Sequence, residues 1–250
     1  DLGAMVDFHR AKGAHATMAL TTVEKVSEYG VVGLDGEGRI ERFQEKPTPE
    51  EAFSNLINAG IYVLEPHVMA HVPTDTKFDF SRNLFPILLE NGQPMYGHTL
   101  DGLWMDIGRP RDLILANQRV LAQVPMPVTG HAIPEGVGEG VWTDASVNYG
   151  PGMTVEGPSM LEAGVEIDEG ARVKGSFLHR GVTVGAGAVV IDSLVMEGCN
   201  LMHHSHVEGC IIDAGSTIGV GANLVRTNVG RDYTVGPNSA HEDDVLGDTP

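Results

Sequence analysis

The chain has 250 residues, which is enough for one large domain or two modest ones. Its 34 acidic residues outnumber 16 basic ones and give a net charge of −18, so no basic stripe can neutralise phosphates and we expect no nucleic-acid partner. No run of 18 apolar residues occurs, and the first residues lack a basic region and an apolar signal-peptide core, so we expect neither a membrane span nor an export signal.

Four segments of the first half have clear local patterns. Residues 2–10 predict a helix, and residues 17–23, rich in β-branched side chains, predict a strand. Residues 29–34 and 39–44 predict the two strands of a β-hairpin, because the residues between them form a glycine-rich turn.

The segments that follow continue this alternation. Residues 57–64 form a nearly continuous apolar run, which is typical of a strand covered on both faces. Residues 84–89 and 110–121 predict helices, the second with proline in its first turn. Strands that alternate with helices indicate an α/β domain, which we place at residues 1–123, and segment 124–134 predicts a linker because it is rich in proline.

The second half carries a 17-residue repeat of aliphatic side chains. Fifteen such residues form three files, with spacings of six, six and five within each turn. The first file is Ile167, Val184, Leu201, Ile218 and Val235; the second is Val173, Val190, Val207 and Leu224; the third is Leu161, Leu178, Val195, Ile212, Val229 and Leu246. Neither a helix nor an alternating strand has this period, whereas a coil with three short sides does. The repeat therefore predicts a parallel β-helix of hexapeptide-like repeats over residues 135–250.

Some residues of the second half do not follow this repeat. Residues 136–152 are glycine-rich but off the repeat, and we expect irregular leading coils there. Cys199 and Cys210 are 11 residues apart and out of phase with the coil, so we expect two buried, reduced thiols, as in a cytoplasmic protein. The acid-rich, lysine-poor composition fits a salt-adapted protein or an ordinary acidic one.

Two short motifs place polar groups at strand ends. Glu45 and Lys46 precede Pro47, which ends a strand. Lys46 could hold a phosphate and Glu45 could accept hydrogen bonds from hydroxyls, or the two form a solvated charge pair at a turn. Asn58 opens the apolar strand, and the small residues up to Gly60 either let a ligand approach, with the amide reading a sugar hydroxyl, or belong to ordinary turn chemistry.

A carboxylate also interrupts the apolar stretch Trp104-Met105-Asp106-Ile107-Gly108. A buried aspartate needs a partner, whether a backbone cap or a cation. Gly108 and Arg109 separate Asp106 from Pro110, which weakens the capping role.

Taken together, these motifs resemble those of the nucleotide-sugar pyrophosphorylases, which join a nucleoside triphosphate to a sugar 1-phosphate and release pyrophosphate. The resemblance runs through Tyr29-Gly30-Val31-Val32, Phe43-Gln44-Glu45-Lys46-Pro47, Ile57-Asn58-Ala59-Gly60-Ile61-Tyr62 and Trp104-Met105-Asp106-Ile107-Gly108, and continues into the β-helix. It implies the sugar-phosphate side of a Rossmann-like α/β nucleotidyltransferase domain with a mixed sheet, followed by a left-handed parallel β-helix.

The same resemblance implies roles for five positions. Gly30 and Glu45 would contact the sugar. Lys46 would hold the sugar phosphate, and Asn58 would bind sugar hydroxyls. Asp106 would bind a catalytic Mg²⁺ ion, which suits a reaction that neutralises charge as the sugar phosphate attacks the α-phosphorus. No covalent enzyme nucleophile is implied, and Lys46 and Asp106 are the candidate catalytic residues.

The family pattern also contains two features without a counterpart in this sequence. One is a glycine-rich loop with Arg and Lys that cradles the triphosphate, and the other is a second metal-binding Asp. The first residues of the chain resemble the helix that follows that Asp. We therefore expect an amino-terminally truncated pyrophosphorylase that is inactive alone.

Three histidines, His203, His204 and His206, lie in one turn of the repeat between inward-facing positions, so some must point outward. The segment that begins at His203 resembles the acetyltransferase half of bifunctional uridylyltransferase–acetyltransferases, in which His203 would be the general base and acetyl-coenzyme A the donor. The match is partial, because His206 stands where a tyrosine is expected. Surface or interface histidines are an alternative; zinc is another, although this spacing does not place three ligands on one face.

Three functions are therefore open. The segments Phe78-Asp79-Phe80-Ser81 and Phe85-Pro86 resemble mannose 1-phosphate guanylyltransferases, which makes GDP-mannose the first choice of product. Residues 108–113 resemble archaeal glucose 1-phosphate or N-acetylglucosamine 1-phosphate enzymes equally well. The alternatives are an acetyl-coenzyme A-dependent acetyltransferase and a non-catalytic regulatory or assembly subunit. Hexapeptide prisms commonly form trimers, so we expect a homo-oligomer of three or more chains.

Overall fold

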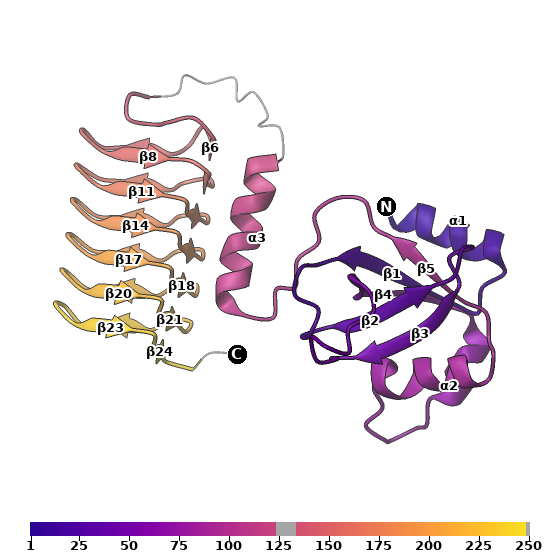
Figure 1. The fold of residues 1–250 in the computed structure, drawn as a ribbon. Helices are drawn as coiled ribbons and strands as arrows, with labels where there is room; N and C mark the ends of the chain where they lie inside the picture. The colour runs from indigo at the N-terminus through magenta and orange to yellow at the C-terminus, as the bar shows by residue number, and fades with distance from the viewer. Residues whose placement is uncertain (124–133, 249–250) are drawn as a thin grey trace. The chain divides into compact units, whose positions relative to one another are not determined.

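The computed structural model describes residues 1–123 and 134–248, which fall into two compact units, Asp1–Trp104 and Met105–Pro250 (Figure 1). The linker expected at residues 124–134 lies outside the described residues except for Pro134. The division between the units differs from the expected boundary, because helix α3 (Pro110–Gln123) groups with the second unit. No helix among the described residues is long and apolar enough to cross a bilayer.

The first unit is built on a five-stranded mixed sheet in the order β3-β2-β4-β1-β5. Its strands are β1 (Ala16–Thr22), β2 (Gly30–Leu34), β3 (Ile40–Glu45), β4 (Leu56–Leu64) and β5 (Met95–Thr99). Strand β1 pairs antiparallel with β4 and parallel with β5, and β2 pairs antiparallel with both β3 and β4. The predicted strands and the hairpin are confirmed, and β5 is an additional strand.

Helices pack on both faces of this sheet. They are α1 (Leu2–Lys12), the 3₁₀-helix η1 (Pro66–His71), the π-helix η2 (Phe80–Leu84) and α2 (Phe85–Glu90). Met5 of α1 packs on Ala19 of β1, whereas Phe85 of α2 packs on the opposite side in a cluster with Met18 and Leu20. Successive strand residues point to opposite faces, so β1 contributes to both clusters. The predicted helices at 2–10 and 84–89 are confirmed.

The second unit is a parallel β-solenoid with three sheets (Figure 1). One sheet holds β6 (Val141–Thr143), β9 (Ser159–Leu161), β12 (Phe177–Leu178), β15 (Leu194–Val195), β18 (Ile211–Ile212), β21 (Asn228–Val229) and β24 (Val245–Leu246). The next holds β7 (Asn148–Tyr149), β10 (Glu166–Ile167), β13 (Thr183–Val184), β16 (Asn200–Leu201), β19 (Thr217–Ile218) and β22 (Thr234–Val235). The last holds β8 (Thr154–Glu156), β11 (Arg172–Lys174), β14 (Val189–Ile191), β17 (His206–Glu208), β20 (Asn223–Val225) and β23 (Ala240–Glu242).

The fifteen residues of the repeat form the inside of this solenoid. All are buried except Leu246, which is partly buried and packs against the same core cluster. Partners on adjacent strands are 17 residues apart, as in the pair Leu201 and Ile218. The parallel β-helix predicted from the repeat is confirmed.

The irregular coils expected at residues 136–152 are a wrong prediction in part, because β6 and β7 lie there and pair with later strands. Trp142 pairs with Met160 and Tyr149 with Ile167, which is a spacing of 18 residues rather than 17. The extra residue lies at the corner that contains Gly157 and Pro158, because Val155 pairs with Val173 at a spacing of 18 whereas Leu161 pairs with Leu178 at 17. Because of this extra residue, β6 and β7 do not follow the 17-residue repeat.

Three further columns of small side chains also line the interior, each two residues before a file of the repeat. They are Val165, Val182, Cys199 and Ser216; Ala171, Ala188, Ser205 and Ala222; and Ser159, Ser176, Ser193, Cys210 and Thr227. Each cysteine therefore follows the 17-residue period in its own column, which corrects the view that they are out of phase. Both thiols are free and buried as predicted, and burial raises the pKa of each to about 11.

The column of Ser159, Ser176, Ser193, Cys210 and Thr227, which we call the serine column, links successive turns by hydrogen bonds. Ser193 Oγ donates to Ile191 O at 2.7 Å and accepts from Cys210 N at 3.1 Å. Ser176 Oγ in turn accepts from Ser193 N at 3.1 Å. Buried polar groups thus have partners here, as stability requires. The buried Ser205 hydroxyl, in another column, has no partner among the described residues.

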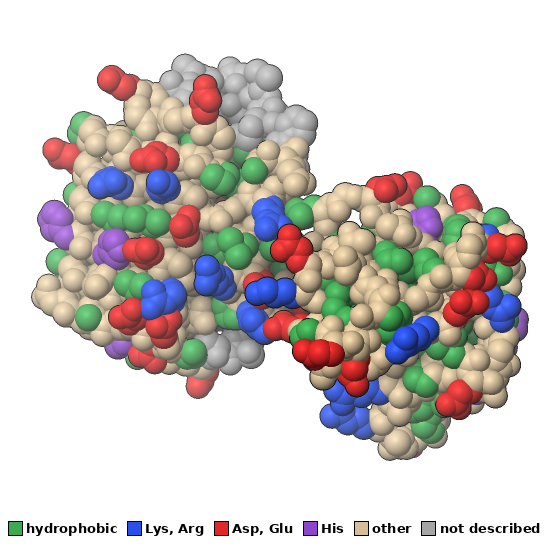
Figure 2. Space-filling view, in the orientation of Figure 1, with side chains coloured by type: hydrophobic (Ala, Val, Ile, Leu, Met, Phe, Trp, Pro, Cys, Tyr) green, Lys and Arg blue, Asp and Glu red, His purple; other side chains and the backbone are tan. Residues whose placement is uncertain are grey.

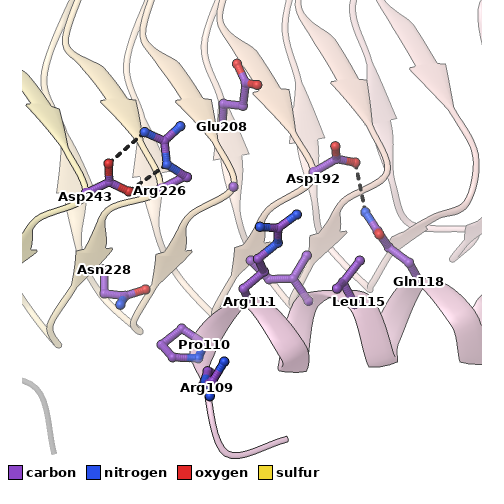
Figure 3. Close-up of a pocket in the computed structure, with 12 residues that line it drawn as sticks. Arg109, Pro110, Arg111, Leu115, Gln118, Asp192, Glu208, Arg226, Asn228 and Asp243 are labelled. Atoms are coloured by element: carbon purple, nitrogen blue, oxygen red, sulfur yellow. Dashed lines mark hydrogen bonds and ion pairs between the residues drawn. The ribbon is translucent and has the colours of Figure 1, made fainter. Parts of the chain in front are cut away.

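Helix α3 packs along the outside of the solenoid within the second unit. Its side chains Ile114 and Leu121 are buried. Gln118 Nε2 donates to Gly175 O and to Asp192 Oδ1, both at 2.8 Å, and Figure 3 shows the second of these bonds. The helix predicted at residues 110–121 is confirmed.

Candidate functional site

The two residues predicted to contact a sugar, Gly30 and Glu45, pair with each other at the ends of β2 and β3. A Cβ on Gly30 would lie 2.8 Å from Glu45 Oε2 and 2.7 Å from Phe43 Cζ, which no real Cβ tolerates. Glycine at this position therefore makes room for the Glu45 carboxylate directly over the backbone of β2.

Glu45 lies among charges of both signs. Burial raises the pKa of Glu45, and the Asp79 carboxylate raises it further, whereas Lys46 and Arg82 oppose the shift. A half-buried carboxylate of this kind accepts hydrogen bonds without being fully solvated. This environment suits the recognition of neutral hydroxyl groups beside an anionic group.

Lys46 follows β3 with an unusual backbone conformation. Its φ is 48°, in the left-handed region that side chains other than glycine rarely adopt, and its N–H donates to Tyr29 O at 2.9 Å. Residues held in this conformation recur at functional sites. The ammonium group is exposed beside Glu45, so the predicted phosphate-holding role stays a prediction with compatible geometry.

Asn58 lies on β4 where the strand bulges. Tyr62 pairs with Met18 and Asn58 with Leu20, so three residues of β4 lie opposite one residue of β1. Gly60, inside this bulge, has a φ of 78° and donates its N–H to Asn58 Oδ1 at 2.9 Å. The predicted turn chemistry is therefore confirmed, whereas the binding role of Asn58 and Gly60 stays a prediction.

The Asn58 amide contacts two side chains that the sequence did not single out. Its Nδ2 lies 2.8 Å from Tyr62 Oη and 3.2 Å from Ser81 Oγ. Burial raises the pKa of Tyr62, the hydrogen bonds from Asn58 and Ser81 lower it, and the carboxylates of Glu45 and Asp79 raise it. The structure therefore brings Glu45, Asn58, Tyr62, Asp79 and Ser81 together in one polar cluster.

A sequence signal for part of this cluster exists. Asp79 caps η2 by accepting from Arg82 N at 2.8 Å, and an Asp directly before the first helical residue is a helix-start pattern. That pattern indicates a helix end, however, and does not show that the end faces β4. The contact depends on tertiary packing.

Asp106 lies in the second unit, and its side chain is exposed. The expectation of a buried carboxylate is wrong, because the neighbouring Ile107 is itself 57% exposed and the stretch forms no apolar core. Asp106 Oδ1 accepts from Gly108 N at 3.0 Å, which is a backbone cap. Across residues 1–123 and 134–248, no three His, Cys, Asp or Glu side chains form a ready metal site.

The histidines among residues 134–248 are exposed or partly exposed, and Figure 2 shows purple side chains on the outside of the solenoid. His203 and His204 are exposed, and His204 has a φ of 57° at a corner. His206, half-buried on β17, lies 3.2 Å from Glu208 Oε2 through its Nε2. The proposed acetyltransferase base, His203, therefore has solvent access but no carboxylate partner among the described residues.

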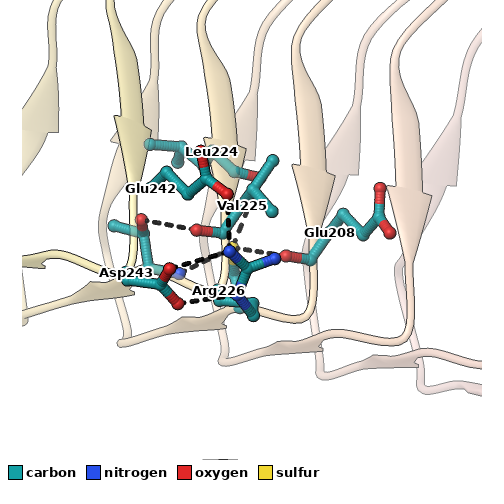
Figure 4. Close-up of polar contacts among 8 residues, drawn as sticks. Glu208, Leu224, Val225, Arg226, Glu242 and Asp243 are labelled. Atoms are coloured by element: carbon teal, nitrogen blue, oxygen red, sulfur yellow. Dashed lines mark hydrogen bonds and ion pairs between the residues drawn. The ribbon is translucent and has the colours of Figure 1, made fainter.

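A hollow lies in the second unit between the first turns of α3 and one corner of the solenoid. Its volume is about 800 Å³. Arg111, Leu115, Glu208, Arg226 and Asn228 are among the residues around it (Figure 3). Arg226 is occupied by ion pairs with Glu242 and Asp243, which Figure 4 shows. The hollow carries charges of both signs and so defines no single ligand.

The fold shows a mixed α/β domain with a polar cluster of side chains on its sheet, joined to a hexapeptide solenoid. The family model of the nucleotidyl transferases matches residues 1–123, and that of the GlmU-like C-terminal hexapeptide domain matches residues 149–236.

Known proteins of similar sequence agree with these matches. A UTP--glucose-1-phosphate uridylyltransferase of Synechocystis sp. is 38% identical over 78% of this chain and 55% of its own length. A mannose-1-phosphate guanylyltransferase of Mycobacterium tuberculosis is 33% identical over 76% of this chain and 52% of its own length. A glucose-1-phosphate adenylyltransferase of Desulforamulus reducens is 28% identical over 80% of this chain and 57% of its own length.

The chain belongs to the sugar-1-phosphate nucleotidyltransferase family. The resemblance found in the sequence motifs is thereby confirmed, together with the hexapeptide solenoid. The chain spans about half the length of the curated relatives it matches.

Proposed function

We propose that this chain carries the sugar 1-phosphate side of a nucleotidyltransferase that forms an NDP-sugar from a nucleoside triphosphate and a hexose 1-phosphate, with release of pyrophosphate. The observation that supports this most is the convergence of Gly30, Glu45 and Asn58 at one end of the sheet, with Lys46 next to Glu45. A carboxylate and an amide suit hydroxyl groups, and an ammonium suits a phosphate.

The residues have distinct tasks in this proposal. Glu45 accepts a hydrogen bond from a sugar hydroxyl and fixes the ring, while Lys46 neutralises part of the charge on the sugar phosphate. Phosphoryl transfer depends mainly on positioning and on charge neutralisation, so these two tasks account for much of what the protein must do.

Asp106 is the proposed Mg²⁺ ligand. Its exposed carboxylate uses Oδ1 to accept the Gly108 N–H, and Mg²⁺ at nucleotide sites is commonly held by only one or two carboxylates, with waters and phosphates as the other ligands. One carboxylate therefore fits such an ion. When bound, Mg²⁺ would lower the charge repulsion between the two phosphates.

Mannose 1-phosphate with GTP is the first substrate pair to test. It is supported by the segment Phe78-Asp79-Phe80-Ser81 and by the names of relatives from Mycobacterium tuberculosis and Arabidopsis thaliana, both mannose-1-phosphate guanylyltransferases. The uridylyltransferase of Synechocystis sp. supports glucose 1-phosphate instead. Both sugar phosphates belong in the experiment.

Calorimetric titration of the 250-residue chain with each sugar 1-phosphate tests the proposal. We expect saturable binding of at least one of them. Lys46→Gln should weaken it about tenfold, since a charge-assisted bond to phosphate is lost. Lys12→Gln is the matched control. The Lys12 side chain is exposed, and its ammonium group donates to the backbone oxygen of Glu37 rather than to a residue of the polar cluster. No saturable binding, or equal affinity for the Lys46 variant, would reject the proposal.

Acetyl transfer from acetyl-coenzyme A is a second candidate, supported by the hexapeptide match over residues 149–236, which includes the exposed His203. The test is transfer to an amino-sugar 1-phosphate by the wild type, His203→Ala and His204→Ala. This candidate requires that His203→Ala lose the transfer activity and that His204→Ala keep it. Sedimentation of the chain at a mass of three or more copies would support the proposed homo-oligomer.

A further inference from the structure

The hydrogen bonds of Asn58 fix which of its amide atoms can meet a ligand. A side-chain amide has two N–H donors and one oxygen with two lone pairs. Nδ2 lies 2.8 Å from Tyr62 Oη and 3.2 Å from Ser81 Oγ, so both donors have partners within the protein. Oδ1 accepts the Gly60 N–H at 2.9 Å, which leaves one lone pair of this oxygen.

The orientation of the amide is determined by its surroundings. If the amide were flipped, its N–H group would face the Gly60 N–H, and two donors would oppose each other. The Gly60 N–H cannot turn away, because the backbone there is fixed by the bulge and by a φ of 78°. Asn58 Oδ1 therefore stays beside Gly60, and Nδ2 stays toward the two hydroxyls.

Packing holds both hydroxyls in place. The Tyr62 ring contacts the rings of Phe80 and Phe85, with centroids 6.0 and 5.0 Å apart. Ser81 lies in η2, directly after Phe80, so the same aromatic contacts fix its position. Each hydroxyl accepts from Asn58 and keeps its own hydrogen for another partner.

We propose that Tyr62 and Ser81 are positioning residues that occupy both amide hydrogens of Asn58 and thereby make Asn58 Oδ1 an acceptor for one substrate hydroxyl. This inference rests on the proposed function, because it names what the same site demands of its sugar. Glu45 is also an acceptor, so the site selects a sugar that donates two hydroxyl hydrogens. Asn58 binds as an acceptor rather than through its N–H groups.

The consequence for substrate choice is specific. A substrate whose hydroxyl is replaced by hydrogen or by a methyl ether at the position facing Oδ1 loses a donor and binds more weakly. Without Tyr62 Oη, the Asn58 amide keeps a hydrogen without a protein partner, and this hydrogen can then donate to an acceptor on the substrate. Its preference for a donor at that position then disappears.

Calorimetry of the full chain tests this with mannose 1-phosphate, glucose 1-phosphate and their monodeoxy analogues. In the wild type, one deoxy position should reduce affinity about tenfold, the effect of one lost hydrogen bond in a buried polar site. In Tyr62→Phe and in Ser81→Ala, the parent sugar phosphate should bind more weakly and that deoxy analogue should lose its disadvantage. Tyr96→Phe is the control, because the Tyr96 ring, on β5, contacts Phe8 and Lys12 of α1 and lies outside the cluster.

A second measurement does not depend on sugar binding. In the free chain, the Asn58 side-chain NH₂ signals in a ¹H–¹⁵N spectrum should be protected from solvent exchange. Tyr62→Phe and Ser81→Ala should each expose one of the two hydrogens, whereas Tyr96→Phe should expose neither. Failure of the wild type to bind any sugar 1-phosphate would reject the proposed function, and these signals would still decide the role of Tyr62 and Ser81.

Two results would overturn the inference. One is unchanged exchange of the Asn58 amide in both variants. The other is a Tyr62→Phe chain that binds each deoxy analogue with the selectivity of the wild type.

Discussion

The side-chain nitrogen of Gln118 lies 2.8 Å from the carboxylate oxygen of Asp192, on the corner of the solenoid beside α3. The same nitrogen donates to Gly175 O, and Gly175 lies 17 residues before Asp192 at the same corner of the preceding turn. One amide on the helix therefore bridges two turns of the repeat. This contact explains why α3 groups with the solenoid rather than with the sheet domain.

Gln118→Ala should loosen α3. The substitution removes two hydrogen bonds, each worth about 1 kcal/mol. Amide hydrogen exchange in residues 110–123 should become faster, while exchange in the serine column should not change. Gln123→Ala is the control, because Gln123 is exposed on the same helix. Equal exchange rates in the two variants would show that Gln118 does not hold the helix.

Ser193→Ala should destabilise the solenoid. Its Oγ donates to Ile191 O and accepts from Cys210 N, so alanine leaves the buried Cys210 N–H without a partner, whereas Ile191 O still accepts the Gly209 N–H. The expected loss in free energy of unfolding is about 1–3 kcal/mol.

Ser205→Ala is the matched control for this prediction. Ser205 is 1% exposed, and its hydroxyl has no partner among the described residues. Its column neighbours are Ala188 and Ala222, so alanine fits the local space. This variant should be neutral or more stable than the wild type in thermal unfolding. A Ser205→Ala chain as unstable as Ser193→Ala would contradict the account of the serine column.

The sequence alone was sufficient for the solenoid, because large aliphatic residues at a fixed period can pack in one way only. It was insufficient for the three columns of small residues. Ser193, Cys199 and Ala188, one from each column, fit their positions by size rather than by hydropathy. It also missed β5, a short strand that contains glycine and histidine.

For the candidate site, the sequence identified the residues that belong to local motifs and missed those brought in by packing. Lys46 follows the end of β3 and Asn58 lies near the start of β4, so both could be found in this way. The contact of Asn58 with Ser81 joins β4 to a π-helix 23 residues away, which no local pattern encodes. Asp106 was misread because Ile107, an apolar neighbour, is exposed.

Gly30→Ala should weaken binding of the sugar phosphate without unfolding the domain. The new Cβ would lie 2.7 Å from Phe43 Cζ and 2.8 Å from Glu45 Oε2, so both the ring and the carboxylate must move. We expect a loss of about tenfold in affinity by calorimetry, the effect of one displaced hydrogen-bonding group. Gly36→Ala is the control, since a Cβ there meets nothing within 4 Å and its φ is not positive. Equal affinities of the two variants would argue against a role for Glu45.

Glu45→Gln should raise stability while it lowers affinity. Burial raises the pKa of Glu45, so the folded state disfavours the ionised form. The stability contribution of this group is therefore present at low pH and is lost as pH rises through its raised pKa. The glutamine variant lacks this loss and should unfold at a higher temperature than the wild type at pH 7. The difference should vanish at acid pH, and a difference that persists there would have another cause.

Arg226→Gln should raise the pKa of Asp243. The Arg226 side chain bonds both oxygens of that carboxylate, at 2.6 and 2.7 Å, and this hydrogen bonding lowers the pKa of Asp243 (Figure 4). A group with a lowered pKa stabilises the fold above its ordinary range and loses that contribution as pH falls through the lowered value. Because both side chains are exposed, the effect on stability should be small.

Titration followed through the ¹³Cγ signals of the aspartates measures this shift directly. In the Arg226 variant, the midpoint of Asp243 should return toward its ordinary value. Asp244 is an internal control, because the Val245 N–H and His241 lower its pKa and Arg226 takes no part. Its midpoint should therefore be the same in both chains. A midpoint of Asp243 that does not move would mean that the ion pair is absent in solution.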